Sequence, residues 1–409
     1  MMTSKLDQQV TKNNLTVSRP NKRSSSCGRE VERFDPIPVD LVINILSRLS
    51  QKFIVRCRCV SKLWSSIIRR PNYNQLFPIK SMDLAPPQLL FVYKVAEELL
   101  FNSSPQPHNP NMNSSLVATL RRRTSSTNFS KFSGHVRGLV CRQHAEGNYT
   151  FAVITNPITG ESLTLPKLRM VGCNSERNNG KVRYYFGYDP IDKQFKVLRI
   201  TWLRCGERES CGEYQVLALG TGNLSWRKIQ CCTLHYPLEG NGIWINGVLY
   251  YPAGFNNGKY TVVCFDVRSE KFSFINIDNY MALKMVYPVS STLIDYKGKL
   301  GACSFDINNN VFELWVLEDA EEHKWLKHIY QMPHQWLNET RHDLRLAGMV
   351  SSGEIVLFPD YTRDIFFIYY YNLESNIITR VRLEVPVLGK FNYCRVYTFI
   401  NFVEAVTLI

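Results

Sequence analysis

The spacing of apolar residues changes once along this chain, near residue 86. Between residues 36 and 68 the apolar residues recur every three or four positions, as in an amphipathic helix. Beyond Pro86 short apolar and aromatic runs alternate with tight polar turns, which is the pattern of short β-strands. The pattern therefore predicts an α+β multi-domain chain, with a small helical unit followed by an all-β domain.

The apolar spacing predicts three short helices in the helical unit. Pro38 opens the first, and Asp40 lies in its first turn, where a negative charge suits the helix dipole. Ser61 is a suitable N-cap for the third, and Pro71 lies just beyond its end. The apolar positions of the three helices are Val39, Leu41, Val42, Ile45, Leu46 and Leu49, then Phe53, Ile54, Cys57 and Val60, then Leu63, Trp64, Ile67 and Ile68. Three short helices bury little surface, so we expect this unit to need a partner.

Hairpin signals recur through the β domain. Four apolar stretches are interrupted by a turn glycine, in "HVRGLVC", "IWINGVLYYP", "LIDYKGKLGAC" and "GMVSSGEIVLF". Asn246-Gly247 is the strongest of these signals, because a type I′ turn needs positive φ at both central residues. A second hairpin follows each one, as in "NPITGESLTLP", "FDVRSEKFSFI" and "YNLESNIITRVRL".

Two hairpins in each repeat of roughly 50 residues make one four-stranded sheet, the size of a kelch-like propeller blade. The stretch 88–409 then holds about six blades. Its two ends, "PPQLLFVYK" and "YCRVYTFINFVEAVTLI", can pair and close the ring without an open sheet edge. A two-sheet β-sandwich array is the alternative, and the regular period favours the ring.

The first 34 residues are polar, rich in Ser, Asn and basic residues, and are expected to form a disordered basic tail. They show no apolar segment typical of a signal peptide, and no stretch of the chain matches a membrane span. We therefore expect a protein of the nucleus and/or cytoplasm with reduced cysteines and no membrane partner. "RPNKRSSSCGRE" fits either a nuclear-import patch or a solvated tail.

The net charge of +14 raises the question of nucleic acid as a partner. Most of the excess is spread along the chain, apart from the tail and Arg121, Arg122 and Arg123. No nucleic-acid-binding motif accompanies it, so the charge is better explained by a basic surface or by an acidic protein partner.

Two cysteine clusters are the candidates for metal or redox chemistry. Cys57 and Cys59 are two residues apart, and on a helix such residues point about 200° away from each other. Cys231 and Cys232 with His235 lack a fourth ligand for a tetrahedral zinc site. The sequence also lacks the nucleophile-elbow, phosphate-loop and dinucleotide motifs. These observations predict no metal, no cofactor and no catalytic residue.

Residues 36–73, "PIPVDLVINILSRLSQKFIVRCRCVSKLWSSIIRRPNY", closely resemble the F-box. Matches to the family pattern are Pro38, Asp40, Leu41, Ile45, Leu46, Arg48, Leu49, Lys52, Arg56, Arg58, Cys59, Val60, Ser61, Lys62, Trp64 and Pro71. Departures are Ile37 for the usual Leu, Asn44 for Glu, Ser50 for Pro and Cys57 for Phe. The following domain resembles the F-box-associated domain of plant F-box proteins, through phrases such as "FGYDPIDKQFKVLRI", "INGVLYYPA" and "LWVLEDAEEHKWLKHI".

The composition predicts a disordered basic tail at 1–34, and the resemblance implies an F-box at 35–77 and an F-box-associated propeller at 88–409. It also implies a substrate receptor of a Skp–cullin–F-box ubiquitin ligase, which binds a Skp-type adaptor, cullin through that adaptor, and a protein substrate. The implied adaptor ridge consists of Pro38, Leu41, Ile45, Leu46 and Leu49, whereas Val60 and Trp64 help hold the helices together and are also candidates for adaptor contact. Alternatives are an F-box scaffold outside a ligase, or a propeller that binds or transforms a small ligand.

Overall fold

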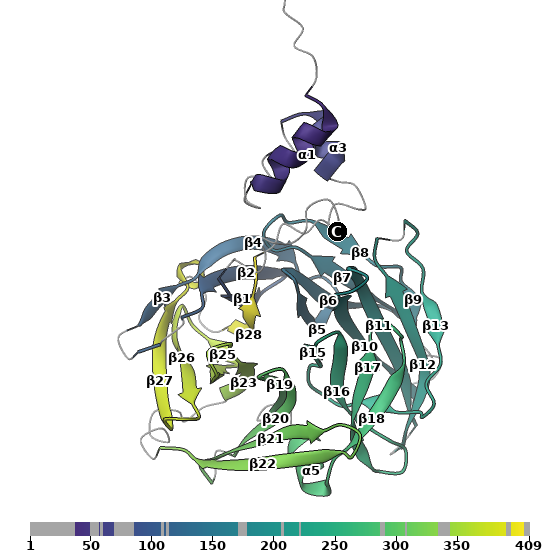
Figure 1. The fold of residues 1–409 in the computed structure, drawn as a ribbon, viewed down its shortest axis with the longest axis vertical. Helices are drawn as coiled ribbons and strands as arrows, with labels where there is room; N and C mark the ends of the chain where they lie inside the picture. Colours follow the sequence, from purple (N-terminus) through teal and green to yellow (C-terminus); the bar gives the residue numbers. More distant parts are fainter. Residues whose placement is uncertain are drawn as a thin grey trace, which may run out of the picture.

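The structure is a computed structural model that places two helices outside a ring of six β-sheets (Figure 1). It describes residues 37–49, 57, 60–68, 86–107, 110–111, 114–170, 178–205, 208–220, 222–286, 291–306, 309–333, 344–389 and 394–404. The predicted basic tail and most of the second predicted helix lie outside these ranges. Helix α1 spans Val39–Arg48 and helix α3 spans Lys62–Ile68.

Each sheet is one blade, and the predicted six-bladed propeller is confirmed. Blade 1 contains β25 (Tyr361–Thr362), β28 (Cys394–Phe402), β1 (Gln88–Val95), β2 (Glu98–Pro105) and β4 (Thr119–Ser125). Blade 2 contains β5 (Phe129–Val136), β6 (Leu139–Glu146), β7 (Tyr149–Thr155), β8 (Ser162–Thr164) and β9 (Leu168–Arg169). Blade 3 contains β10 (Asn178–Asp189), β11 (Gln194–Cys205), β12 (Arg208–Ala218) and β13 (Arg227–Ile229).

The other three blades follow in chain order. Blade 4 contains β14 (Tyr236–Pro237), β15 (Ile243–Ile245), β16 (Val248–Gly254), β17 (Tyr260–Asp266) and β18 (Phe272–Asn276). Helix α5 (Asn279–Val286) leads to blade 5, with β19 (Ser291–Tyr296), β20 (Lys299–Asp306), β21 (Val311–Asp319) and β22 (Lys324–Gln331). Blade 6 contains β23 (Leu344–Met349), β24 (Glu354–Pro359), β26 (Ile365–Asn372), β27 (Ile377–Glu384) and β3 (Ser115–Val117), and the short helix η1 (Pro386–Leu388) leads to β28.

The ring is closed twice. Strand β28 pairs antiparallel with β1, from Lys94 opposite Arg395 to Gln88 opposite Phe402, as the sequence predicted. Strand β3 adds a second closure by pairing parallel with the outer strand β27 of blade 6. Each closure joins an early segment to a late one, so the first and last blades cannot separate without losing backbone hydrogen bonds.

Two kinds of turn repeat around the ring. Three of the four predicted glycine hairpins have positive φ at both central residues, as in Asn246-Gly247 (51° and 83°) and Lys297-Gly298 (53° and 85°), whereas in the fourth Gly353 has positive φ (95°) and Ser352 does not. In the second kind, an Asp or Asn accepts hydrogen bonds from the backbone N–H groups two and three residues later. These residues are Asn156, Asp189, Asp319 and Asn372. Asn156 and Asp189 are fully buried, so at these two turns packing and local hydrogen bonds both hold the reversal.

Apolar side chains fill the spaces between neighbouring blades, in six clusters around the ring. Blades 3 and 4, for example, share a cluster that includes Tyr185, Leu198 and Tyr251. Among the described residues, no helix is long and apolar enough to cross a bilayer.

Candidate functional site

Helix α1 has an inward apolar side that packs against α3. Val42 and Leu46 are four residues apart, so they lie on one side of the helix, and both are fully buried with Ile67 of α3. Leu49 and Trp64 pack on this small core and are half-buried. Among the described residues of the helical unit, these three side chains are the ones that are fully buried.

A second apolar side of α1 faces outward. Ile37, Leu41 and Ile45 follow one another at four-residue intervals, and they are 46%, 54% and 41% exposed. Pro38 is also exposed, and its carbonyl accepts the first backbone hydrogen bonds of the helix, from Leu41 and Val42. We call Ile37, Pro38, Leu41 and Ile45 the outward row. Apolar residues thus cover two sides of a ten-residue helix, and the described residues of α3 pack on one of them.

The third predicted helix begins as expected. The Ser61 hydroxyl accepts a hydrogen bond from the backbone N–H of Trp64 at 3.1 Å, which is the geometry of an N-cap. Cys57 packs on the helical core, and burial raises the pKa of its thiol. Cys57 therefore acts as a packing residue here, whereas Cys59 lies outside the described residues.

The seven residues predicted to bind an adaptor do not share one surface. Pro38, Leu41 and Ile45 lie together on the outward row, but Leu46 lies inside the helical core. Val60 is 63% exposed on the turn before α3. Because most of the second predicted helix lies outside the described residues, its role in holding the three helices together stays a prediction. Ile37 was not among the predicted adaptor-contacting residues, although its four-residue spacing from Leu41 is visible in the sequence.

The second cysteine cluster is a hydrogen-bonded core. His235 is 1% exposed, and its Nε2 accepts a hydrogen bond from the Tyr251 hydroxyl at 2.6 Å, because its Nδ1–H donates to the Thr233 carbonyl at 3.1 Å. Burial lowers the pKa of His235 to about 4, so the ring is neutral at physiological pH. Both ring nitrogens are thus occupied. Within the described ranges, no group of three or more His, Cys, Asp or Glu side chains is arranged to hold a metal ion.

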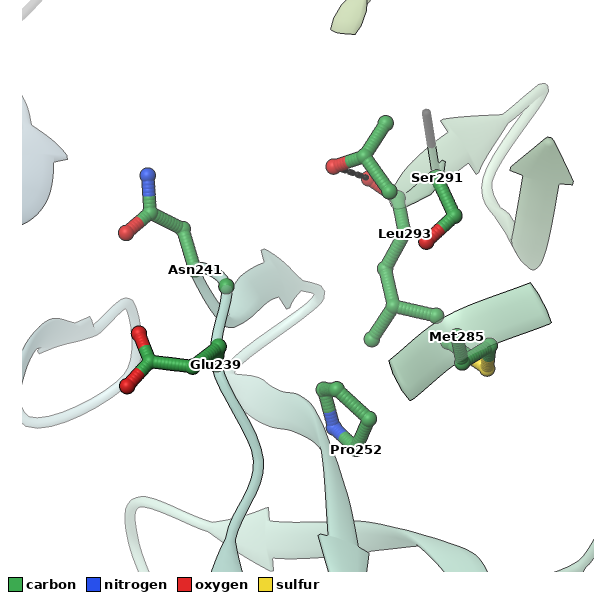
Figure 2. Close-up of a pocket in the computed structure, with 8 residues that line it drawn as sticks. Glu239, Asn241, Pro252, Met285, Ser291 and Leu293 are labelled. Atoms are coloured by element: carbon green, nitrogen blue, oxygen red, sulfur yellow. Dashed lines mark hydrogen bonds between the residues drawn. The ribbon is translucent and has the colours of Figure 1, made fainter. Parts of the chain in front are cut away.

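The propeller has a small, open recess between blades 4 and 5. Figure 2 shows Glu239 and Asn241 on one side of it and Met285, Ser291 and Leu293 on the other. Pro252 forms part of the apolar lining. Its lining combines apolar side chains with the carboxylate of Glu239 and the hydroxyls of Ser291 and Thr292.

Comparison with known proteins covers nearly all of the chain after the tail. The family model described as "F-box domain" matches residues 34–76, and the family model described as "F-box associated beta propeller domain" matches residues 88–403. The Arabidopsis thaliana F-box protein At1g53550 is 64% identical over 414 residues, which cover 99% of this chain and 100% of that protein. The F-box protein DOR of the same plant is 44% identical, with 95% of this chain and 97% of that protein covered. The F-box protein At5g65850, also of that plant, is 41% identical, with 99% and 98% covered.

Proposed function

This chain belongs to the family of F-box proteins with an F-box associated beta propeller domain, and on that premise we propose that it is the substrate-recognition subunit of a Skp–cullin–F-box ubiquitin ligase. The helical unit would bind a Skp-type adaptor, which in turn binds cullin. The propeller would hold the protein to be ubiquitinated. The proposed complex acts in the nucleus and/or cytoplasm.

The observation that carries this proposal is the outward row. Leu41 and Ile45 stay about half exposed on a helix whose other apolar side is already packed. Covering each side chain against an apolar partner surface would contribute roughly 1.5–3 kcal/mol at most. A partner helix bundle would therefore bury the outward row of α1.

The proposed role of the chain is to bring a substrate protein close to the subunits that transfer ubiquitin. Holding a substrate near the ubiquitin-transferring subunits raises its effective concentration and orients its lysines, and neither effect needs a catalytic residue in this chain. The propeller suits that role, because its blades form a rigid ring on which exposed turns and strand ends can vary. We accordingly assign no reaction step to the residues of this chain.

The proposal is tested by measuring adaptor binding to a full chain in which two apolar residues of the outward row are replaced by glutamate. The double variant Leu41→Glu/Ile45→Glu places two charges where an apolar interface would form, and should weaken adaptor binding at least ~100-fold. Because neither side chain belongs to the buried core, circular dichroism of the variant should match that of the natural chain.

Asn44→Glu is the matched control. It adds a negative charge to an exposed position of the same helix, where it can still contact Arg48 one turn later. Adaptor binding should be unchanged in this variant. Leu46→Glu is unsuitable as a test, since a charge among Val42 and Ile67 would unfold the helical unit itself. If the folded double variant binds the adaptor as tightly as the natural chain, the outward row is not the adaptor site and the proposal fails.

A further inference from the structure

A run of three arginines, Arg121, Arg122 and Arg123, lies in β4 and leads directly to the hydroxyls of Thr124 and Ser125. In the described part of the chain, these two are the only hydroxyl residues with arginine at both the second and the third preceding positions. Arginine-directed serine/threonine kinases select their acceptors by cations at these positions, which carboxylates of the kinase bind. The run therefore marks Thr124 and Ser125 as candidate phosphorylation sites.

Strand β4 is well placed for an encounter with a kinase. It is the outermost strand of blade 1, and among the described strands it pairs with β2 alone. The pairing is irregular, since the register shifts between Phe101 and Asn102 of β2. None of the seven residues of β4 is buried. An extended outer strand without buried side chains can enter a kinase groove at little cost in apolar contacts.

The structure favours Ser125 over Thr124 as the acceptor. The third residue before Thr124 is Arg121, whose guanidinium is held by the Glu404 carboxylate at 2.6 Å. The Thr124 side chain is itself half-buried, and its hydroxyl accepts a hydrogen bond from Arg142 at 3.2 Å. Both the recognition cation and the acceptor oxygen are thus already engaged at Thr124.

Ser125 meets the same requirements without these obstacles. Its side chain is exposed at the last position of the strand, and Arg122 and Arg123, at the third and second preceding positions, are exposed as well. Arg123 lies 3.4 Å from the carboxylate of Glu98, and both side chains are about half exposed. An ion pair of this kind contributes little to stability, so Arg123 can exchange it for a carboxylate of a kinase.

The surroundings of Ser125 can also hold an added phosphate. The Ser125 hydroxyl accepts a hydrogen bond from the backbone N–H of Thr127 at 3.1 Å. Arg123, two residues earlier in the strand, lies on the same side of the sheet as Ser125. In the neighbouring blade, Arg142 donates to the Ser125 carbonyl at 3.4 Å. One N–H group and two guanidinium groups are therefore close to the acceptor.

Arg142 is a buried cation, and its residue is only 5% exposed. Among the described residues its hydrogen-bond partners are the hydroxyls of Thr124 and Thr155 and the carbonyl of Ser125, and its Nε has none. Burial lowers the pKa of Arg142 to about 10, so it keeps its positive charge at physiological pH. A phosphate nearby would offset the cost of burying this charge.

We propose that Ser125 is an acceptor for an arginine-directed serine/threonine kinase, and that Arg123, Arg142 and the Thr127 N–H group stabilise its phosphate. In the transfer, the Ser125 oxygen bonds to the γ-phosphorus of ATP, the bond from that phosphorus to the β,γ-bridging oxygen breaks, and ADP leaves. The hydroxyl proton passes to a carboxylate of the kinase. The modification places a charge of about −2 at the junction of blades 1 and 2. The inference is independent of the proposed function.

The test uses the full natural chain, Mg-ATP and the catalytic subunit of cyclic-AMP-dependent protein kinase as the arginine-directed probe. Phosphate is located by peptide mass spectrometry, because Lys22 and Arg23 precede Ser25 in the tail and labelling there would confuse a total count. The natural chain should carry phosphate on Ser125. The Ser125→Ala chain should lose this phosphate without gaining one on Thr124.

The arginines and the fold are tested separately. Arg122→Gln/Arg123→Gln should lower kcat/KM for phosphorylation of Ser125 at least tenfold. Arg268→Gln/Lys271→Gln removes the same charge from an exposed turn before β18 and should leave it unchanged. A synthetic peptide of residues 118–130 reports the rate without the fold. The folded chain should be labelled within tenfold of that rate, at a temperature well below its thermal transition.

Three outcomes would overturn the assignment of Ser125. They are phosphate on Thr124 but not on Ser125, an unchanged rate in the Arg122→Gln/Arg123→Gln chain, and labelling of the free peptide without labelling of the folded chain. The labelled chain should keep at least the thermal midpoint of the unlabelled chain, because the added charge lies among cations. A lower midpoint would show that Arg123 and Arg142 do not stabilise the phosphate.

Discussion

His235 shows how a single buried side chain makes this fold sensitive to acid. It lies between Tyr214 and Tyr251, and its neutral form satisfies the hydroxyl of Tyr251 and the carbonyl of Thr233. Burial lowers the pKa of His144 to about 4 as well, and there the positive charge of Arg142 adds to the effect. Both rings would have to take up a proton in apolar surroundings, so each resists protonation while the chain is folded.

We predict that lowering the pH from 7.5 to 5 destabilises the propeller. The folded pKa of His235 is depressed below the ordinary value of 6.5, so the unfolded chain binds the proton first. The stabilising effect is complete above pH 6.5 and is lost progressively as the pH falls toward 4. At pH 5 this amounts to about 2 kcal/mol for one histidine, by proton linkage. Urea unfolding midpoints at the two pH values measure it.

His235→Gln provides the comparison for that measurement. The variant lowers stability at both pH values, because it disturbs the hydrogen bonds to Tyr251 and Thr233. Its midpoint should nevertheless shift less between pH 7.5 and 5 than the midpoint of the natural chain. An equal shift in both proteins would mean that His235 does not contribute to acid sensitivity.

Sequence alone predicted some residue roles and not others. The Ser61 cap could be predicted because it depends only on a residue three positions away. Leu41 and Leu46 could not be separated, because they lie on adjoining sides of one helix and the position of α3 decides which side is buried.

At the scale of elements, the pairing of β28 with β1 determines whether the ring exists. Both strands are strongly apolar. They are the two segments that remain once the domain is divided into repeats of two hairpins, so the sequence predicted that they pair. Strand β3 and helix α5 were not predicted. β3 has only three residues and pairs in parallel with a distant strand, and α5 has eight residues, so neither carries enough periodic signal.

A chain that ends at residue 393 should fail to form a closed propeller. It lacks β28, which leaves the hydrogen-bonding edge of β1 and the buried side chains of Leu90 and Val92 uncovered. We expect the shortened chain to lose its cooperative thermal transition and to aggregate. A synthetic peptide of residues 394–404, added during refolding, should restore the transition. A cooperative transition in the shortened chain without the peptide would contradict the closure account.

At the scale of the whole molecule, the chain combines two folding units with different proposed contacts. The outward row is apolar and lies on the helical unit, whereas the propeller is a closed ring of blades with its own cores. In the proposed function the adaptor contacts the first unit and the substrate contacts the second, so the two contacts need not compete.

The central claim is that this chain brings bound proteins to a ubiquitin ligase through its outward row. The most direct measurement compares the ubiquitin attached to proteins that co-purify with the natural chain and with Leu41→Glu/Ile45→Glu in plant cells. We predict that the same proteins remain bound to the variant, with at least tenfold less ubiquitin on them. Equal ubiquitin on the proteins bound to both chains would contradict the claim.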